Sequence, residues 1–84
     1  MTTVLCIDDN AVVLQLQKAL LEAWSYMVLT APDGATGIAI SRERSLDAVV
    51  LDLNMAGIDS TEVVCVFRKE QPNLPVVKVA CERA

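Results

Sequence analysis

The chain has no histidine, and its three cysteines follow no spacing typical of a metal site or a disulfide framework. Cys6, Cys65 and Cys81 are isolated residues without a CxxC pair. Structural zinc sites need clustered Cys and His ligands, so the sequence excludes one. Cys6 and Cys65 lie inside apolar runs, and we expect both in the core, while Cys81 lies near the chain end. Free cysteines of this kind are typical of a reducing cytoplasm.

Positive charge is also scarce. Seven Lys and Arg stand against 11 Asp and Glu, which gives a net charge of -4, and the basic residues form no run. Phosphate contacts dominate affinity for nucleic acid, so we expect no direct binding of nucleic acid. No apolar stretch reaches the ~20 residues that span a bilayer, and residues 1–3 carry no charged leader. These absences predict a cytoplasmic protein without a membrane partner.

The apolar content, in contrast, is high for the length of the chain. Hydrophobic residues make up 54% of 84 residues. A chain of this size forms one domain and buries only about 60–65% of the surface that its unfolded state exposes. Apolar surface is therefore left over, and we expect a homo-oligomer or another partner to cover it.

Short apolar runs alternate with segments of helical periodicity. The runs are rich in β-branched residues, which is typical of buried parallel strands. The first helical segment begins after Asn10, a good N-cap, and carries Val13, Leu16, Leu20 and Trp24 at helical spacing. The pattern predicts an α/β fold, a doubly wound parallel sheet. The expected strands are 3–7, 27–30, 47–53 and 76–80, and the expected helices are 11–25, 35–44 and 60–69, with a loop at 56–59.

Acidic residues directly follow two of the predicted strands. Asp8 and Asp9 come after Val4–Ile7, and Asp52 comes after Ala48–Leu51. The carboxyl ends of parallel strands meet at one edge of the sheet, where open α/β folds carry their sites. Three carboxylates gathered there repel one another unless a cation lies between them. Oxygen ligands without His or a neighbouring Cys suit a hard cation, above all Mg2+.

Four segments resemble response regulator receiver domains of two-component signalling. The segment Val4–Asn10 is similar to the family's first strand ending in two acids, and Leu51–Ser60 is similar to its phosphoacceptor segment. Ala31–Gly34 and Leu74–Val77 resemble its entries to the second helix and the fourth strand. The resemblance implies the flavodoxin-like strand order 2-1-3-4-5. It also implies a single receiver-like domain, 1–84, truncated after the fourth strand and lacking the fifth strand and last helices.

The resemblance also implies a role for each residue of the acidic site. Asp52 would be the phosphoacceptor, a carboxylate nucleophile that forms an acyl phosphate. Asp9 would bind Mg2+ directly, Asp8 would bind it through a water, and the Asn54 main-chain carbonyl would complete the protein ligands beside Asp52. The phosphoryl donor would be a histidine kinase or a phosphotransfer protein, and the domain itself would not be an enzyme.

The chain departs from the family pattern at several positions. Ala80 stands where the family has a Ser or Thr that contacts the phosphoryl group, and no fifth strand supplies the family's Lys. Lys78 lies within the fourth predicted strand and is either a charge that discourages edge pairing or a buried amine. Ala56 replaces the usual Pro, and Ser60 replaces the usual Gly.

Three functions therefore compete. The first is a phosphoacceptor receiver that uses Asp52 and Mg2+. The second is a degenerate receiver that acts as a phosphorylation-independent dimerisation or interaction module, which Ala80 favours. The third is a Mg2+-dependent phosphohydrolase, which usually places an acid two residues after its nucleophile, where this chain has Asn54.

Overall fold

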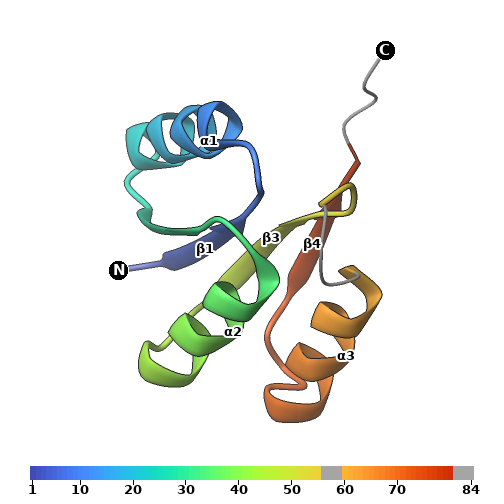
Figure 1. Ribbon diagram of the computed structural model, residues 1–84. Helices are drawn as coiled ribbons and strands as arrows, with labels where there is room; N and C mark the ends of the chain where they lie inside the picture. The colour runs from blue at the N-terminus through green and yellow to red at the C-terminus, as the bar shows by residue number, and fades with distance from the viewer. Residues whose placement is uncertain (56–59, 81–84) are drawn as a thin grey trace.

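The described part of the chain, residues 1–55 and 60–80 of a computed structural model, alternates strands and helices (Figure 1). Its four strands form one parallel sheet in the order β2-β1-β3-β4. The predicted alternation and strand order are confirmed, and the ends of the elements differ from the predicted ones by at most two residues. The predicted loop 56–59 and Cys81 lie outside the described residues. The elements are β1 (Thr3–Ile7), α1 (Ala11–Ala23), β2 (Met27–Ala31), α2 (Gly34–Glu43), β3 (Ala48–Asp52), α3 (Ser60–Glu70) and β4 (Val76–Val79).

The sheet is covered on both faces. Successive residues of a strand point to opposite faces, so each strand supplies side chains to two apolar cores. Helices α2 and α3 cover the larger core, in which Leu5, Ile7 and Phe67 are almost completely buried. Helix α1 covers the smaller core, which contains Cys6 and Leu14.

Local signals explain where α1 and α2 begin. The Asn10 side chain accepts hydrogen bonds from the backbone N–H groups of Val12 and Val13, at 3.0 and 3.2 Å. The Asp33 side chain accepts one from the N–H of Thr36, at 2.7 Å. Each acceptor satisfies a donor that the first turn of a helix leaves without an intrahelical partner. The predicted cap at Asn10 is confirmed.

Gly37 lets α2 approach β1 closely. A Cβ atom at this position would overlap Ile7 Cδ1 and lie 2.8 Å from Ile7 Cγ1. The absence of a side chain at Gly37 therefore lets α2 pack on the sheet at this distance.

Two expectations about buried side chains need correction. Cys65 is exposed, because α3 turns Val63, Val64 and Phe67 towards the sheet and Cys65 away from it. Cys6, in contrast, is buried as predicted. The helical spacing noted along α1 also does not mark its buried face. Leu14 is the buried apolar residue there, while Leu16 is 60% exposed and Trp24 is 77% exposed.

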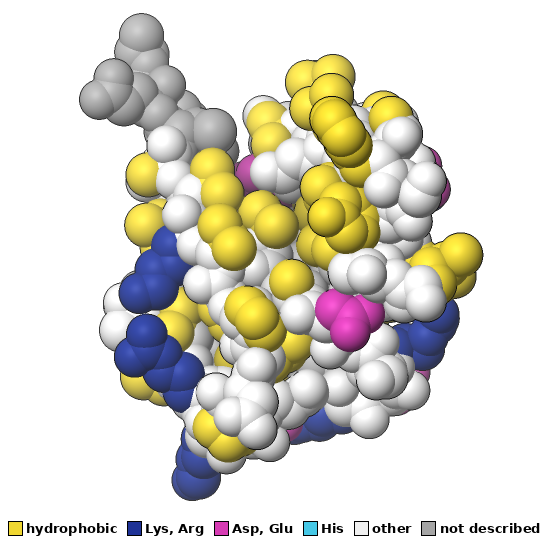
Figure 2. Space-filling view, turned by 180° about the vertical axis from the view of Figure 1, so that it is seen from behind, with side chains coloured by type: hydrophobic (Ala, Val, Ile, Leu, Met, Phe, Trp, Pro, Cys, Tyr) yellow, Lys and Arg dark blue, Asp and Glu magenta, His cyan; other side chains and the backbone are white. Residues whose placement is uncertain are grey.

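Much apolar surface remains uncovered in the described chain. Val12, Leu16, Leu20 and Trp24 form an exposed stripe along α1, spaced four residues apart. Seen from behind, the molecule shows apolar side chains over a large part of this face (Figure 2). At the β4 edge of the sheet Lys78 is exposed, which agrees with a charge that discourages edge pairing and not with a buried amine. None of the helices among residues 1–55 and 60–80 is long and apolar enough to cross a membrane.

Candidate functional site

The pairing of β1 with β3 brings the three predicted acids together. The two strands are parallel neighbours, and their register ends with Ile7 opposite Leu51. The residues that follow, Asp8 and Asp52, therefore emerge at the same level on the carboxyl edge of the sheet. One carboxylate oxygen from each of Asp8, Asp9 and Asp52 lies within 4.8 Å of the other two.

The two inner acids are buried and held by the backbone. Asp8 and Asp52 are each 3% exposed, whereas Asp9 is exposed. Asp8 Oδ1 accepts a hydrogen bond from the N–H of Asn10 at 2.8 Å, and Asp52 Oδ1 accepts one from the N–H of Asn54 at 3.0 Å. In both cases the donor lies two residues further along the chain, which is the local turn that Asp favours. The carboxylates are thus oriented before any ligand binds.

The site holds several negative charges close together where water has little access. Burial raises the pKa of Asp8, and the charges of Asp52 and Asp9 raise it further, against the opposing effect of the Asn10 N–H. Burial, followed by the charge of Asp8, also raises the pKa of the neighbouring Cys6 thiol to about 11. A cation between the carboxylates would relieve the repulsion that these shifts reflect.

The donor set fits a small hard cation. Carboxylate and carbonyl oxygens are the ligands of Mg2+ in proteins, at about 2.0–2.1 Å. Two oxygens bound directly to one such ion are at most about 4.2 Å apart, which is close to the 4.8 Å limit of this cluster. The cluster is therefore of the right size for one ion, and Asn54, tied to Asp52 through its N–H, brings its own carbonyl into the same turn.

One residue of the site was missed as a functional candidate. Ser60, at the start of α3, is 6% exposed and its hydroxyl donates a hydrogen bond to the main-chain carbonyl of Asp52, at 2.9 Å. The sequence predicted only that a helix begins at this residue. One signal in the sequence could have indicated a functional role: Ser60 carries a hydroxyl at a position where the receiver pattern has glycine.

The predicted departures from the receiver pattern remain. Val79 pairs with Asp52 in the sheet, so the next residue, Ala80, follows the strand beside the acids and brings no hydroxyl. Lys78 does not take the place of the lysine that the family pattern has. It lines a cavity of about 170 Å³ against α3, together with Cys65 and Arg68, and none of the three acids lines that cavity.

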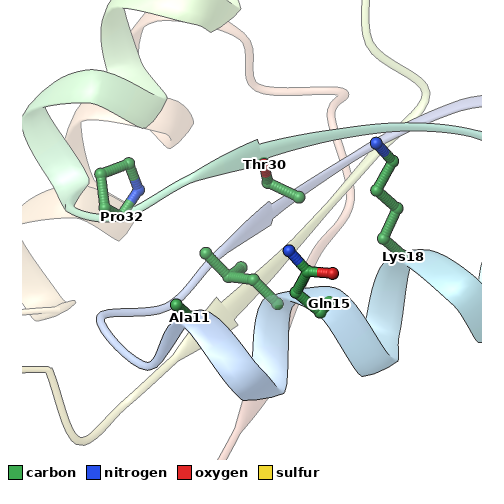
Figure 3. A pocket seen from close by; sticks show the side chains of 6 residues that line it. Ala11, Gln15, Lys18, Thr30 and Pro32 are labelled. Carbon is green, nitrogen blue, oxygen red and sulfur yellow. The ribbon is translucent and has the colours of Figure 1, made fainter.

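A second cavity, of about 320 Å³, lies between α1 and the end of β2 (Figure 3). The acids at the carboxyl edge do not line it either. Its polar side chains are Gln15, Lys18 and Thr30, which belong to two different elements and show no acidic or nucleophilic grouping. The chemistry of the described chain is therefore concentrated at the acidic edge of the sheet and not in this cavity.

Comparison with known proteins matches the chain to one family. Residues 4–84 match the family model described as the response regulator receiver domain. The chain is 33% identical over 82 residues to the probable transcriptional regulatory protein TcrX of Mycobacterium tuberculosis. That match covers 98% of this chain but only 35% of TcrX, so the chain spans about a third of the length of this relative.

Solved structures agree with the sequence matches. The chemotaxis protein CheY4 of Vibrio cholerae superposes with a TM-score of 0.91 and 27% identity, over 100% of this chain and 72% of that one. The response regulator TrrA of Thermotoga maritima, solved in complex with Mg2+-BeF, superposes with a TM-score of 0.92 and 27% identity, over 98% of this chain and 71% of that one. TrrA has also been solved in complex with the histidine kinase ThkA.

Proposed function

The chain belongs to the response regulator receiver domain family of two-component signalling, and from that premise we propose that it accepts a phosphoryl group on Asp52 with the help of Mg2+. The observation that carries the proposal is the gathering of Asp8, Asp9 and Asp52 within 4.8 Å at the carboxyl edge of the sheet. Two of these acids are buried, which is costly unless the site binds a cation.

Each residue has a distinct part in the proposed site. Asp52 is the nucleophile. Asp9 and Asp52 bind the cation directly, Asp8 binds it through a water, and the main-chain carbonyl of Asn54 completes the set. Mg2+, when bound, offsets the negative charge of Asp52 against that of the incoming phosphoryl group. The hydrogen bond from the Asn54 N–H to Asp52 Oδ1 orients the carboxylate that makes the attack.

The transfer itself is a displacement at phosphorus. An oxygen of the Asp52 carboxylate forms a bond to phosphorus, and the bond from phosphorus to the nitrogen of a phosphohistidine breaks. The electron pair of that bond leaves with the imidazole, and an acyl phosphate remains on Asp52. We propose a histidine kinase or a phosphotransfer protein as the donor, by analogy with the TrrA–ThkA complex.

We further propose that the domain is a phosphorylation target and not an enzyme that turns over phosphate esters. The residue two positions after the nucleophile is Asn54, which cannot serve as the second acid of a phosphohydrolase. A cytoplasmic location fits the free cysteines. The net charge of -4 makes direct DNA binding by this domain unfavourable, although relatives such as TcrX are named as transcriptional regulators.

We also propose that the chain associates with a second copy. The support is the exposed apolar stripe along α1, where Leu16, Leu20 and Trp24 are 60%, 64% and 77% exposed. Monomeric proteins rarely expose apolar patches of more than a few hundred Å². A two-fold dimer is the commonest closed assembly that would cover such a surface.

Incubation with a small acyl phosphate donor and Mg2+, followed by intact mass measurement, tests the central proposal. We expect one added phosphoryl group on the unaltered chain, none on Asp52→Asn, and full addition on the control variant Asp33→Asn, whose side chain lies at the start of α2. Omission of Mg2+ should abolish the addition. A chain that gains no phosphoryl group would favour the phosphorylation-independent dimerisation module instead.

A further inference from the structure

Ser60 is tied to the main chain of the residue that carries the nucleophile. Its Oγ donates a buried hydrogen bond of 2.9 Å to the carbonyl oxygen of Asp52, eight residues earlier. Ser60 is 6% exposed and Asp52 is 3% exposed, so water has little access to either partner. A buried carbonyl of this kind needs a protein donor, and leaving it without one costs about 1–3 kcal/mol.

Asp52 lies at the end of β3, and a side chain supplies the donor to its carbonyl. The ladder between β1 and β3 ends with Ile7 opposite Leu51, one residue before Asp52. On the other side of β3, the N–H of Leu53 donates to the carbonyl of Val79. The carbonyl of Asp52 thus lies at the end of the register with β1, and the Ser60 hydroxyl donates to it there.

The same hydrogen bond acts close to Asn54 in the chain. It holds the carbonyl of Asp52, two residues before Asn54. The N–H of Asn54 holds Asp52 Oδ1 at 3.0 Å. Asp52 is therefore held at two points, its carbonyl by Ser60 and its carboxylate by Asn54.

From these contacts we propose that Ser60 is a positioning residue for phosphoryl transfer. Its hydroxyl keeps the backbone of Asp52 oriented so that the carboxylate of Asp52 and the carbonyl of Asn54 face the same cation. The inference rests on the proposed function, since it gives Ser60 a role in that same reaction. The receiver pattern has a glycine at this position, and glycine has no side-chain donor. The hydrogen bond from Ser60 is therefore a feature of this chain's own sequence.

Three variants test the role. Ser60→Ala removes the donor. Ser60→Thr keeps a hydroxyl, and its extra methyl group has room because Ser60 lines the cavity of about 170 Å³ beside Val64. Ser41→Ala is the matched control: Ser41 is also buried, at 5% exposed, and its Oγ donates to a main-chain carbonyl, that of Ile38, but within α2.

The measurement is the rate of phosphorylation by a small acyl phosphate as a function of Mg2+ concentration, with amide spectra of each variant. In the reaction an Asp52 oxygen bonds to phosphorus, the bond from phosphorus to the donor's carboxylate oxygen breaks, and the carboxylate leaves. We expect Ser60→Ala to lower the limiting rate about tenfold, with amide shifts at Leu53 and Asn54. We expect Ser60→Thr and Ser41→Ala to stay within about twofold of the unaltered chain.

The outcomes separate this role from the proposed function. A Ser60→Ala rate within twofold of the unaltered chain, or a Ser60→Thr rate as slow as that of Ser60→Ala, would overturn the role and leave the function standing. Absence of phosphorylation in the unaltered chain would overturn the function, and the role with it. If Ser60→Ala does not fold, Ser60→Cys replaces it, because a thiol has a similar shape and is a much weaker donor.

Discussion

Neutralising Asp8 should stabilise the protein in the absence of a divalent cation. The pKa of Asp8 is raised from its ordinary value of 3.8, chiefly by burial and then by its acidic neighbours. The native state therefore binds a proton at Asp8 more tightly than the unfolded state does. The free energy of unfolding falls as pH rises from the unfolded pKa through the folded one, and the loss is complete above the folded pKa. In Asp8→Asn this loss is removed.

The size of the effect follows from the geometry of the cluster. Two unit charges 4.8 Å apart interact by about 3.5 kcal/mol at an effective dielectric constant of 20. Asp52 is buried and contributes most of this repulsion, whereas solvent screens the exposed Asp9. An Asn side chain still accepts the hydrogen bond from the N–H of Asn10. We therefore expect Asp8→Asn to gain about 1–3 kcal/mol at pH 7 and low salt.

Thermal unfolding with and without Mg2+ measures this gain. One kcal/mol corresponds to a shift in Tm of about 4–8 °C for a domain of this size. Mg2+ at ten times its Kd should add about 1.4 kcal/mol to the unaltered chain and much less to Asp8→Asn. The control is Asp33→Asn, which should gain nothing, because the hydrogen bond from the Thr36 N–H lowers the pKa of Asp33 and so favours its charged form. An Asp8→Asn variant less stable than the unaltered chain at pH 7 would refute the reasoning.

Three further predictions concern the rest of the molecule. Gly37→Ala should lower the free energy of unfolding by about 1–3 kcal/mol because of overlap with Ile7; in denaturant titrations Ile7→Val should cost less in the Gly37→Ala background than alone, and equal costs would contradict the close approach. Brief alkylation followed by peptide mass mapping should modify the exposed Cys65 and spare the buried Cys6 until the protein unfolds; equal modification of both would contradict the described burial. Light scattering over a dilution series should show dissociation of a dimer, and in Trp24→Ser this dissociation should occur at a higher protein concentration; a monomer at all concentrations would contradict the proposal of self-association.

The architecture and the acidic edge could be predicted because they depend on patterns local to the chain. Apolar runs rich in β-branched residues marked the four strands of the described chain, and Asn10 marked the start of α1. The position of Asp8 and Asp52 directly after two strands was enough to place them at one edge, since every parallel strand ends on the same side of its sheet. None of these inferences required knowledge of which side chains touch.

Only the tertiary structure decided the features that depend on contacts between distant residues. Cys65 and the stripe from Leu16 to Trp24 are apolar and helically spaced, yet the direction in which a helix turns depends on the sheet beneath it. Gly37 matters because Ile7, thirty residues earlier, occupies the space that its side chain would fill. The hydrogen bond from Ser60 to Asp52 joins the start of α3 to the end of β3, eight residues earlier in the chain. The periodicity of apolar residues predicts which residues are buried. It does not predict which residues they contact, because those contacts depend on strand register and on close packing between distant segments.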